Sequence, residues 1–146
     1  MSKYTERAEA LFRSGYNCSQ AVFCTFAVDV GLTEEQAARI SIGLGGGVGR
    51  MREVCGAISG AAMLVGLAKP DYDKAKVYET VREITEEFRK KHNSVICKDL
   101  LGLKEVNFNE KPEPRTPEFY LKRPCLKIIC DAVCAIEKVL FKKENN

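Results

Sequence analysis

Residues Asn17–Val28 read NCSQAVFCTFAV and predict the helix at the centre of the fold. Asn17 is a favourable N-cap, and Gln20 stands where a capping box places its second side chain. From Ala21 onward the segment is apolar on nearly every side, which is typical of a helix enclosed by other elements. Gly31 ends the segment. Because a helix without a polar face needs partners all around it, we expect a bundle of helices.

The rest of the chain predicts further helices and contains no strand of convincing length. Caps and apolar periodicity mark Thr5–Ser14, a helix opened by the capping box Thr33–Gln36, Val54–Leu67, Asp71–Lys91, Ser94–Leu101 and a last helix with Pro124 in its first position. Before the last helix lies Leu103–Arg123, a long irregular segment rich in proline, which at this length is either functional or disordered. We therefore expect residues 1–146 to form a single all-α domain, a bundle of about six or seven helices with a long irregular loop before the last one.

Composition and charge are those of an ordinary globular protein. The chain has 45% hydrophobic and 29% charged residues, and its net charge of +3 is too small to indicate a nucleic-acid partner. The first residues contain no apolar signal-peptide core, and the longest apolar stretch, Val54–Ala68, is too short to span a bilayer. The odd number of cysteines, 7, without an export signal argues against a disulfide framework. We expect a cytoplasmic protein that is not inserted in a membrane.

Four of the seven cysteines stand where a helix is expected to begin. A helix N-terminus presents unpaired N–H groups and a partial positive charge, so a thiol placed there ionises more easily and becomes a better nucleophile or metal ligand. The alternative is that small residues merely suit crowded helix ends. Because the four come from different helices, they form one site only if the fold brings those helix ends together. These helix-start cysteines are Cys18, Cys55, Cys97 and Cys125.

The remaining cysteines and the single histidine predict structural roles. Cys24, Cys130 and Cys134 lie inside expected helices among apolar neighbours, so we expect them to pack in the core. His92 follows two lysines at a polar helix end, where we expect a solvated side chain. The chain contains no Cys-x-x-Cys, Ser-His-Asp or His-Glu-x-x-His pattern. Their absence speaks against a thioredoxin-like motif, an ordinary zinc ribbon, covalent haem and hydrolysis.

Two glycine patterns predict either close packing or a binding site. The run Gly43–Gly49 could aim backbone N–H groups at an anion, with Arg50 and Arg52 beside it, but it lacks a nucleotide-binding spacing, and a flexible connector is the default interpretation. Gly56 and Gly60 lie four apart on one helix, a spacing that lets another helix or a cofactor approach closely. The candidate cofactor contacts are therefore Gly45, Gly46, Gly47, Arg52, Gly56 and Gly60.

Five stretches taken in order resemble one protein family. They are Asn17-Cys18-Ser19-Gln20-Ala21-Val22, Gly43-Leu44-Gly45-Gly46-Gly47, Cys55-Gly56-Ala57-Ile58-Ser59-Gly60, Cys97-Lys98-Asp99-Leu100-Leu101-Gly102 and Cys125. This set is similar to the C_GCAxxG_C_C family, small bacterial and archaeal proteins described as redox-active. The resemblance covers the chain from Asn17 to Cys125 and implies that the helix-start cysteines are the family's four. A related module occurs in split-Soret cytochrome c, but this chain lacks that protein's haem-attachment motif.

The leading hypothesis is redox chemistry in one of two forms. The four thiols would bind an iron–sulfur cluster or a metal ion, or pairs of them would cycle between dithiol and disulfide, with Cys18 and Cys55 as the expected attacking thiols. The alternatives are a non-catalytic binding module with structural cysteines and a structural zinc protein. The sequence does not identify the redox partner, and it is compatible with a homo-oligomer.

Overall fold

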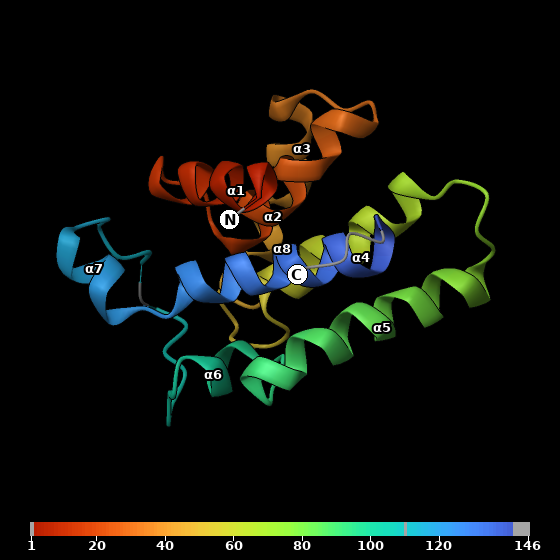
Figure 1. Ribbon diagram of the computed structural model, residues 1–146. Helices are drawn as coiled ribbons and strands as arrows, with labels where there is room; N and C mark the ends of the chain where they lie inside the picture. The colour runs from red at the N-terminus through yellow and green to blue at the C-terminus, as the bar shows by residue number, and fades with distance from the viewer. Residues whose placement is uncertain (1, 110, 142–146) are drawn as a thin grey trace.

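The computed structural model describes residues 2–109 and 111–141. Within them the chain forms eight α-helices and no strand, so the all-α prediction is confirmed (Figure 1). The helices are α1 (Lys3–Arg13), α2 (Cys18–Ala27), α3 (Glu34–Ser41), α4 (Gly56–Ala68), α5 (Lys74–His92), α6 (Cys97–Leu100), α7 (Pro117–Lys122) and α8 (Cys125–Leu140), with the 3-10 turns η1 (Val28–Val30) and η2 (Ile42–Leu44). In this part of the chain, no helix combines the length and the apolar character needed to cross a membrane.

Helix α2 is the centre of the bundle, as its sequence predicts. It packs against α1, α3, α4 and α8, and all of its residues from Ser19 to Ala27 are buried. The expected capping box is present, because Asn17 Oδ1 accepts from the Gln20 amide and Gln20 Oε1 accepts from the Asn17 amide, each at 3.0 Å. The same device opens α3 at Thr33.

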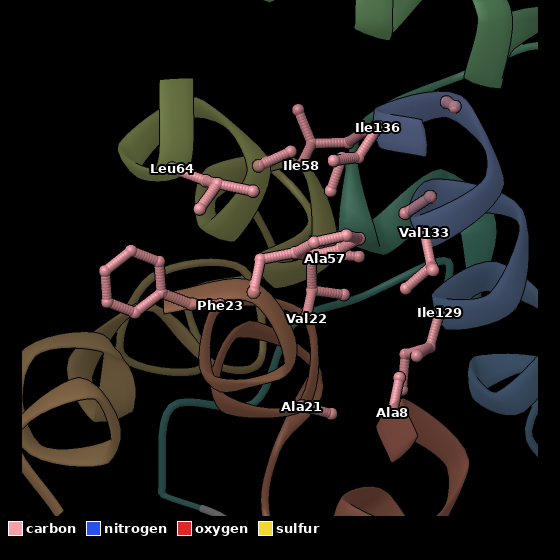
Figure 2. Close-up of a cluster of buried hydrophobic side chains, with 14 of the residues drawn as sticks. Ala8, Ala21, Val22, Phe23, Ala57, Ile58, Leu64, Ile129, Val133 and Ile136 are labelled. Atoms are coloured by element: carbon pink, nitrogen blue, oxygen red, sulfur yellow. The ribbon is translucent and has the colours of Figure 1, made fainter. Parts of the chain in front are cut away.

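Helix α8 crosses the molecule between α1 and α5 and packs against both (Figure 1). Its apolar face includes Ile129, Val133 and Ile136, none of which is exposed to solvent. Figure 2 shows these side chains meeting Val22 of α2 and Ala57 of α4 in one cluster. The core therefore lies between α1, α2, α4 and α8.

The contact between α2 and α4 is unusually close because of two glycines. A Cβ added to Gly56 would lie 3.0 Å from the Ser19 amide nitrogen, and one added to Gly60 would lie 3.0 Å from the Ser19 carbonyl oxygen. The close-packing interpretation of these glycines is thus correct. Because Ser19 directly follows Cys18, this contact also sets the start of α2 beside the start of α4.

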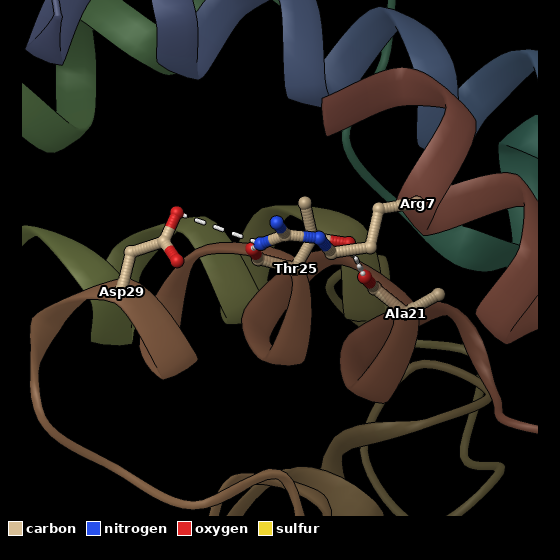
Figure 3. A network of polar contacts seen from close by, with 4 residues as sticks. All are labelled: Arg7, Ala21, Thr25 and Asp29. Carbon is tan, nitrogen blue, oxygen red and sulfur yellow. Dashed lines mark hydrogen bonds and ion pairs between the residues drawn. The ribbon is translucent and has the colours of Figure 1, made fainter. Parts of the chain in front are cut away.

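Arg7 of α1 binds the C-terminal half of α2 (Figure 3). Arg7 Nη1 donates to the Thr25 carbonyl oxygen at 2.7 Å and lies 3.5 Å from Asp29 Oδ2. The Thr25 hydroxyl in turn donates to the Ala21 carbonyl oxygen at 2.7 Å. A cation at the carbonyl end of a helix is electrostatically favourable, so the pairing fixes α1 over α2.

Some sequence-based boundaries differ from the structure. The segment Leu103–Arg123 is not irregular throughout, because its end forms α7, with the Thr116 hydroxyl accepting from the Phe119 amide and Pro117 in the first turn. Helix α4 begins at Gly56 rather than Val54. Pro124 is the N-cap of α8 and not its first residue.

The prediction of a solvated histidine is wrong. The His92 side chain is only 11% exposed, stacks on Phe88 with ring centroids 4.5 Å apart, and places Nε2 2.7 Å from Asp131 Oδ2. The lysines before His92 do face solvent, but the end of α5 packs against α8 and buries the ring between them. This contact depends on tertiary structure, which the local polarity of the sequence does not show.

Candidate functional site

The helix-start positions of the four cysteines are confirmed. Cys18, Cys97 and Cys125 are the first residues of α2, α6 and α8, and Cys55 is the N-cap of α4. Helices α2, α4 and α8 are long enough for the partial positive charge of their N-termini to favour a thiolate.

The fold brings these four helix ends together around one cavity of about 500 Å³. All four cysteines line it. Cys18 and Cys125 are half-buried, whereas Cys55 and Cys97 are only 4% and 8% exposed. The four helix starts therefore face one cavity, although no three of the thiols are grouped closely enough to hold a metal ion in the described residues.

A short backbone pairing joins the two buried cysteines. Val54 and Ile96 form an isolated antiparallel bridge, flanked by the Cys55 amide donating to the Val95 carbonyl at 2.7 Å and the Cys97 amide donating to the Glu53 carbonyl at 2.6 Å. Hydrogen bonds of this kind fix the register of two extended segments. The start of α6 is therefore held beside the start of α4.

The glycine run forms a closed loop against the cavity, which the default prediction of a flexible connector missed. The amides of residues 48–53 all donate to carbonyl oxygens of residues 43–48, so these amides do not form an anion cradle. Gly47 has φ +77°, and a Cβ there would lie 2.8 Å from Cys97 Cβ. Val48, Arg50 and Arg52 also have left-handed φ values, of 64°, 64° and 63°.

Five of the six predicted cofactor contacts line the cavity. They are Gly45, Gly46, Gly47, Arg52 and Gly56. Gly45 lies against the Asn17 side chain that caps α2, so the loop also supports the start of that helix. Gly60 lies instead in the contact between α2 and α4 described above.

Three arginines place positive charge near the thiols, and the sequence predicted only the first of them, Arg52, as a site residue. Arg52 Nη1 donates to Cys97 Sγ at 3.6 Å. Arg115 donates to two carbonyl oxygens that precede α2, those of Phe12 and Tyr16, each at 2.8 Å. Arg123 forms an ion pair with Glu113 and also lines the cavity.

The segment before α8 supplies Arg115 and Arg123. It covers the cavity with Phe119, whose ring faces the Arg115 guanidinium at 4.9 Å. Only its proline content and its aromatic residues hinted at this role in the sequence. The two arginines carry no local pattern that could have marked them.

Cys18 and Cys125 are two thiols of the cavity wall that change each other's pKa. Interaction with the Cys18 thiol is the largest cause of the lowered pKa of Cys125, which falls to about 7, and the positive charges of Arg123, Arg115 and Arg52 lower it further. The same interaction is the main reason why the pKa of Cys18 is raised. Near neutral pH the Cys125 thiol is therefore partly ionised, whereas Cys18 stays protonated.

The pKa shifts do not favour the predicted attacking thiols, Cys18 and Cys55. Burial raises the pKa of Cys55 to about 12, although the nearby backbone amides of Ala57 and Ile58 oppose the rise. Accessible thiols of low pKa are the reactive ones, and within this group Cys125 fits that description.

Comparison with known proteins identifies the family. Residues 16–139 match the sequence model of the family described as "Putative redox-active protein (C_GCAxxG_C_C)". The chain belongs to the C_GCAxxG_C_C family. No curated protein and no solved structure matches it. The resemblance drawn from the motifs is thus confirmed, and the matched range includes all four cysteines of the cavity.

Within this C_GCAxxG_C_C protein the other three cysteines are set apart from the cavity lining. Cys24 is 1% exposed, and burial raises its pKa to about 11, which confirms its core position. Cys130 and Cys134 are half-buried, so their assignment to the core is only partly correct. None of the seven cysteines forms a disulfide.

Over residues 2–109 and 111–141, no three or more His, Cys, Asp or Glu side chains are grouped so that they could hold a metal ion.

Proposed function

We propose that this chain is a thiol redox protein in which Cys18 and Cys125 alternate between a dithiol and a disulfide. The observation that carries the proposal is that both side chains line one cavity, where each is the main influence on the other's pKa. Both residues are half-buried and line the cavity, through which an oxidant can reach them. The redox description of the family agrees with this chemistry.

The reaction is a thiol–disulfide exchange that transfers two electrons. The Cys125 thiolate attacks one sulfur of a partner disulfide, a Cys125–partner bond forms, and the partner's other sulfur leaves as a thiolate. Cys18 then gives up its proton and attacks the Cys125 sulfur, which releases the partner's second thiolate. The protein gains one S–S bond, and the partner gains two thiols.

The surrounding groups fit these roles. Arg115 and Arg123 stabilise the thiolate on Cys125, because a nearby positive charge favours the ionised form. Cys18 serves as the resolving thiol, since its raised pKa keeps it protonated until the mixed disulfide forms. Cys55 and Cys97, which are buried, take no part in the exchange.

A second candidate follows from the convergence of all four thiols, because a dithiol needs only two. Cys18, Cys55, Cys97 and Cys125 are a donor set suited to an iron–sulfur cluster, which would supply one-electron transfer when bound. The hydrogen bond that Arg52 donates to Cys97 would suit a cluster-bound thiolate as well as a free thiol. The donor types fit the group, but in the described residues the sulfurs are not grouped closely enough to hold a metal ion, so this candidate requires them to move together.

One preparation separates the two candidates. The protein is purified anaerobically, and iron, zinc and acid-labile sulfide are assayed before the thiols are titrated. The thiol-pair proposal expects no stoichiometric iron or sulfide, and peptide mapping after mild oxidation should find a Cys18–Cys125 disulfide. Bound iron and sulfide that are lost in Cys55→Ser or Cys97→Ser would instead establish the cluster.

A further inference from the structure

The cavity is much larger than the thiol pair itself requires. Its volume of about 500 Å³ lies in the range of small-molecule sites and allows a ligand to lie against the two sulfurs. Apolar side chains form much of the wall: Phe12, Leu100, Leu101, Phe108, Phe119 and Ile128. A folded protein surface does not enter a space of this size, whereas a compact organic molecule does.

The charge of the wall is strongly one-sided. Among the described lining residues, Glu113 is the one carboxylate, and it is paired with Arg123. Besides the paired Arg123, the excess of positive charge comes from Arg52 and Arg115. Arg115 donates to carbonyl oxygens and Arg52 to a thiol, partners that do not cancel a positive charge. In a cavity of low dielectric such an excess attracts anions.

We propose that the oxidant of this site is a small anionic disulfide, a low-molecular-weight compound with acidic groups flanking its S–S bond. This inference rests on the proposed Cys18–Cys125 pair and adds the class of its partner. The acidic groups would face the arginines while the S–S bond lies at Cys125. The compound leaves as two thiols, and the protein keeps the disulfide, so the electrons balance as in the exchange above.

The test compares three short disulfides that differ mainly in charge. The reduced protein is mixed with 3,3′-dithiodipropionate, which is anionic, bis(2-hydroxyethyl) disulfide, which is neutral, or cystamine, which is cationic. Each rate is divided by the rate of the same disulfide with dithiothreitol, which removes differences in intrinsic reactivity. At low ionic strength we expect the normalised rate to be about tenfold higher for the anion than for the cation, and the ratio to shrink with salt.

Three variants on the covering segment make the test specific. Arg123→Gln should lower the ratio of anionic to cationic rates several-fold, Arg123→Lys should retain it, and Glu113→Gln should raise it. The ratio is informative because a changed thiolate population affects both rates equally and cancels.

Three results would overturn the inference. Equal or reversed normalised rates would do so, as would a ratio that neither Arg123→Gln nor Glu113→Gln changes, or faster oxidation by a protein disulfide such as that of insulin. In those cases a Cys18–Cys125 disulfide still forms, and the proposed function stands. If no probe produces that disulfide, the proposed function fails as well.

Discussion

Helix α8 carries three cysteines, and its two parts give them opposite chemistry. Cys125 at the N-terminus has a pKa lowered to about 7, whereas burial raises the pKa of Cys130 and Cys134 in the middle of the helix. All three are half-buried, so exposure does not distinguish them. The difference comes from the neighbours: a thiol donor on α2 and arginines at one end, and apolar packing with carboxylates at the other.

The comparison teaches that convergence, and not the helix start alone, makes the reactive thiol. Cys55 also stands at the N-cap of a helix with backbone amides near its sulfur, yet its pKa rises to about 12 because it is buried. Cys125 differs by facing Cys18, Arg115 and Arg123. A helix N-terminus thus contributes to the thiolate at Cys125 but does not create it.

The largest effect is expected from removing the reactive thiol itself. Cys125→Ser should abolish formation of the intramolecular disulfide, because Cys18 then has no partner sulfur. The matched change Cys134→Ser, on the same helix, should leave the disulfide yield unchanged. Peptide mapping of the oxidised proteins by mass spectrometry measures both. Equal disulfide yields in the two variants would contradict the difference between the two parts of α8.

The next effect concerns the close contact that sets the start of α2 beside the start of α4. Gly56→Ala should destabilise the protein by about 1–3 kcal/mol, because its Cβ would press against backbone atoms of Ser19 and Leu44. Gly66→Ala on the same helix has nothing within 4 Å of its Cβ and should stabilise by about 0.5–1 kcal/mol. Urea unfolding of both variants gives the two free energies. Similar values for both would show that α2 and α4 are not in tight contact.

The pH dependence of alkylation sharpens the comparison directly. The thiolate is the reacting form, so the Cys125 rate should rise with pH and reach half its maximum near pH 7. Cys134, with its raised pKa, should still be accelerating above about pH 8.5. At pH 7 we expect Cys125 to react about tenfold faster, after allowing for the weaker nucleophilicity of a low-pKa thiolate. Iodoacetamide labelling followed by mass spectrometry resolves the two sites, and a shared midpoint would contradict the assignment.

The smallest effect is expected from a single arginine. Arg123→Gln should raise the pKa of Cys125 and slow its alkylation at pH 7 by a few-fold, since it removes one of several favourable charges. Arg123→Lys keeps the charge and should behave like the original protein. Stopped-flow alkylation compares the variants. An unchanged pH midpoint of Cys125 alkylation in Arg123→Gln would show that Arg123 does not lower the pKa of Cys125.

The local parts of this fold could be predicted from the sequence. The capping box of Asn17 and Gln20 lies within four residues, and the apolar run after it identifies a buried helix without further information. Helix α7 was not predicted, because a segment rich in proline is expected to be irregular. Thr116 and Pro117 are nevertheless an ordinary N-cap and first residue. His92 was misplaced because only tertiary packing brings Asp131 to it.

The sequence predicted which cysteines line the candidate site, but not which of them ionises. Family motifs and helix starts both selected the same four cysteines, and the structure places them around one cavity. Which of them ionises depends on contacts between residues far apart in the chain, such as Cys18 with Cys125. No spacing in the sequence contains that information.

The left-handed backbone conformation of Arg52 lowers the stability of the domain. A non-glycine residue at φ 63° costs about 1–2 kcal/mol, and glycine would relieve most of that cost. Arg52→Gly is therefore expected to melt at a higher temperature while leaving the Cys97 sulfur without its guanidinium donor. Selection for thermal stability alone would remove this arginine, so its presence represents stability given up for chemistry.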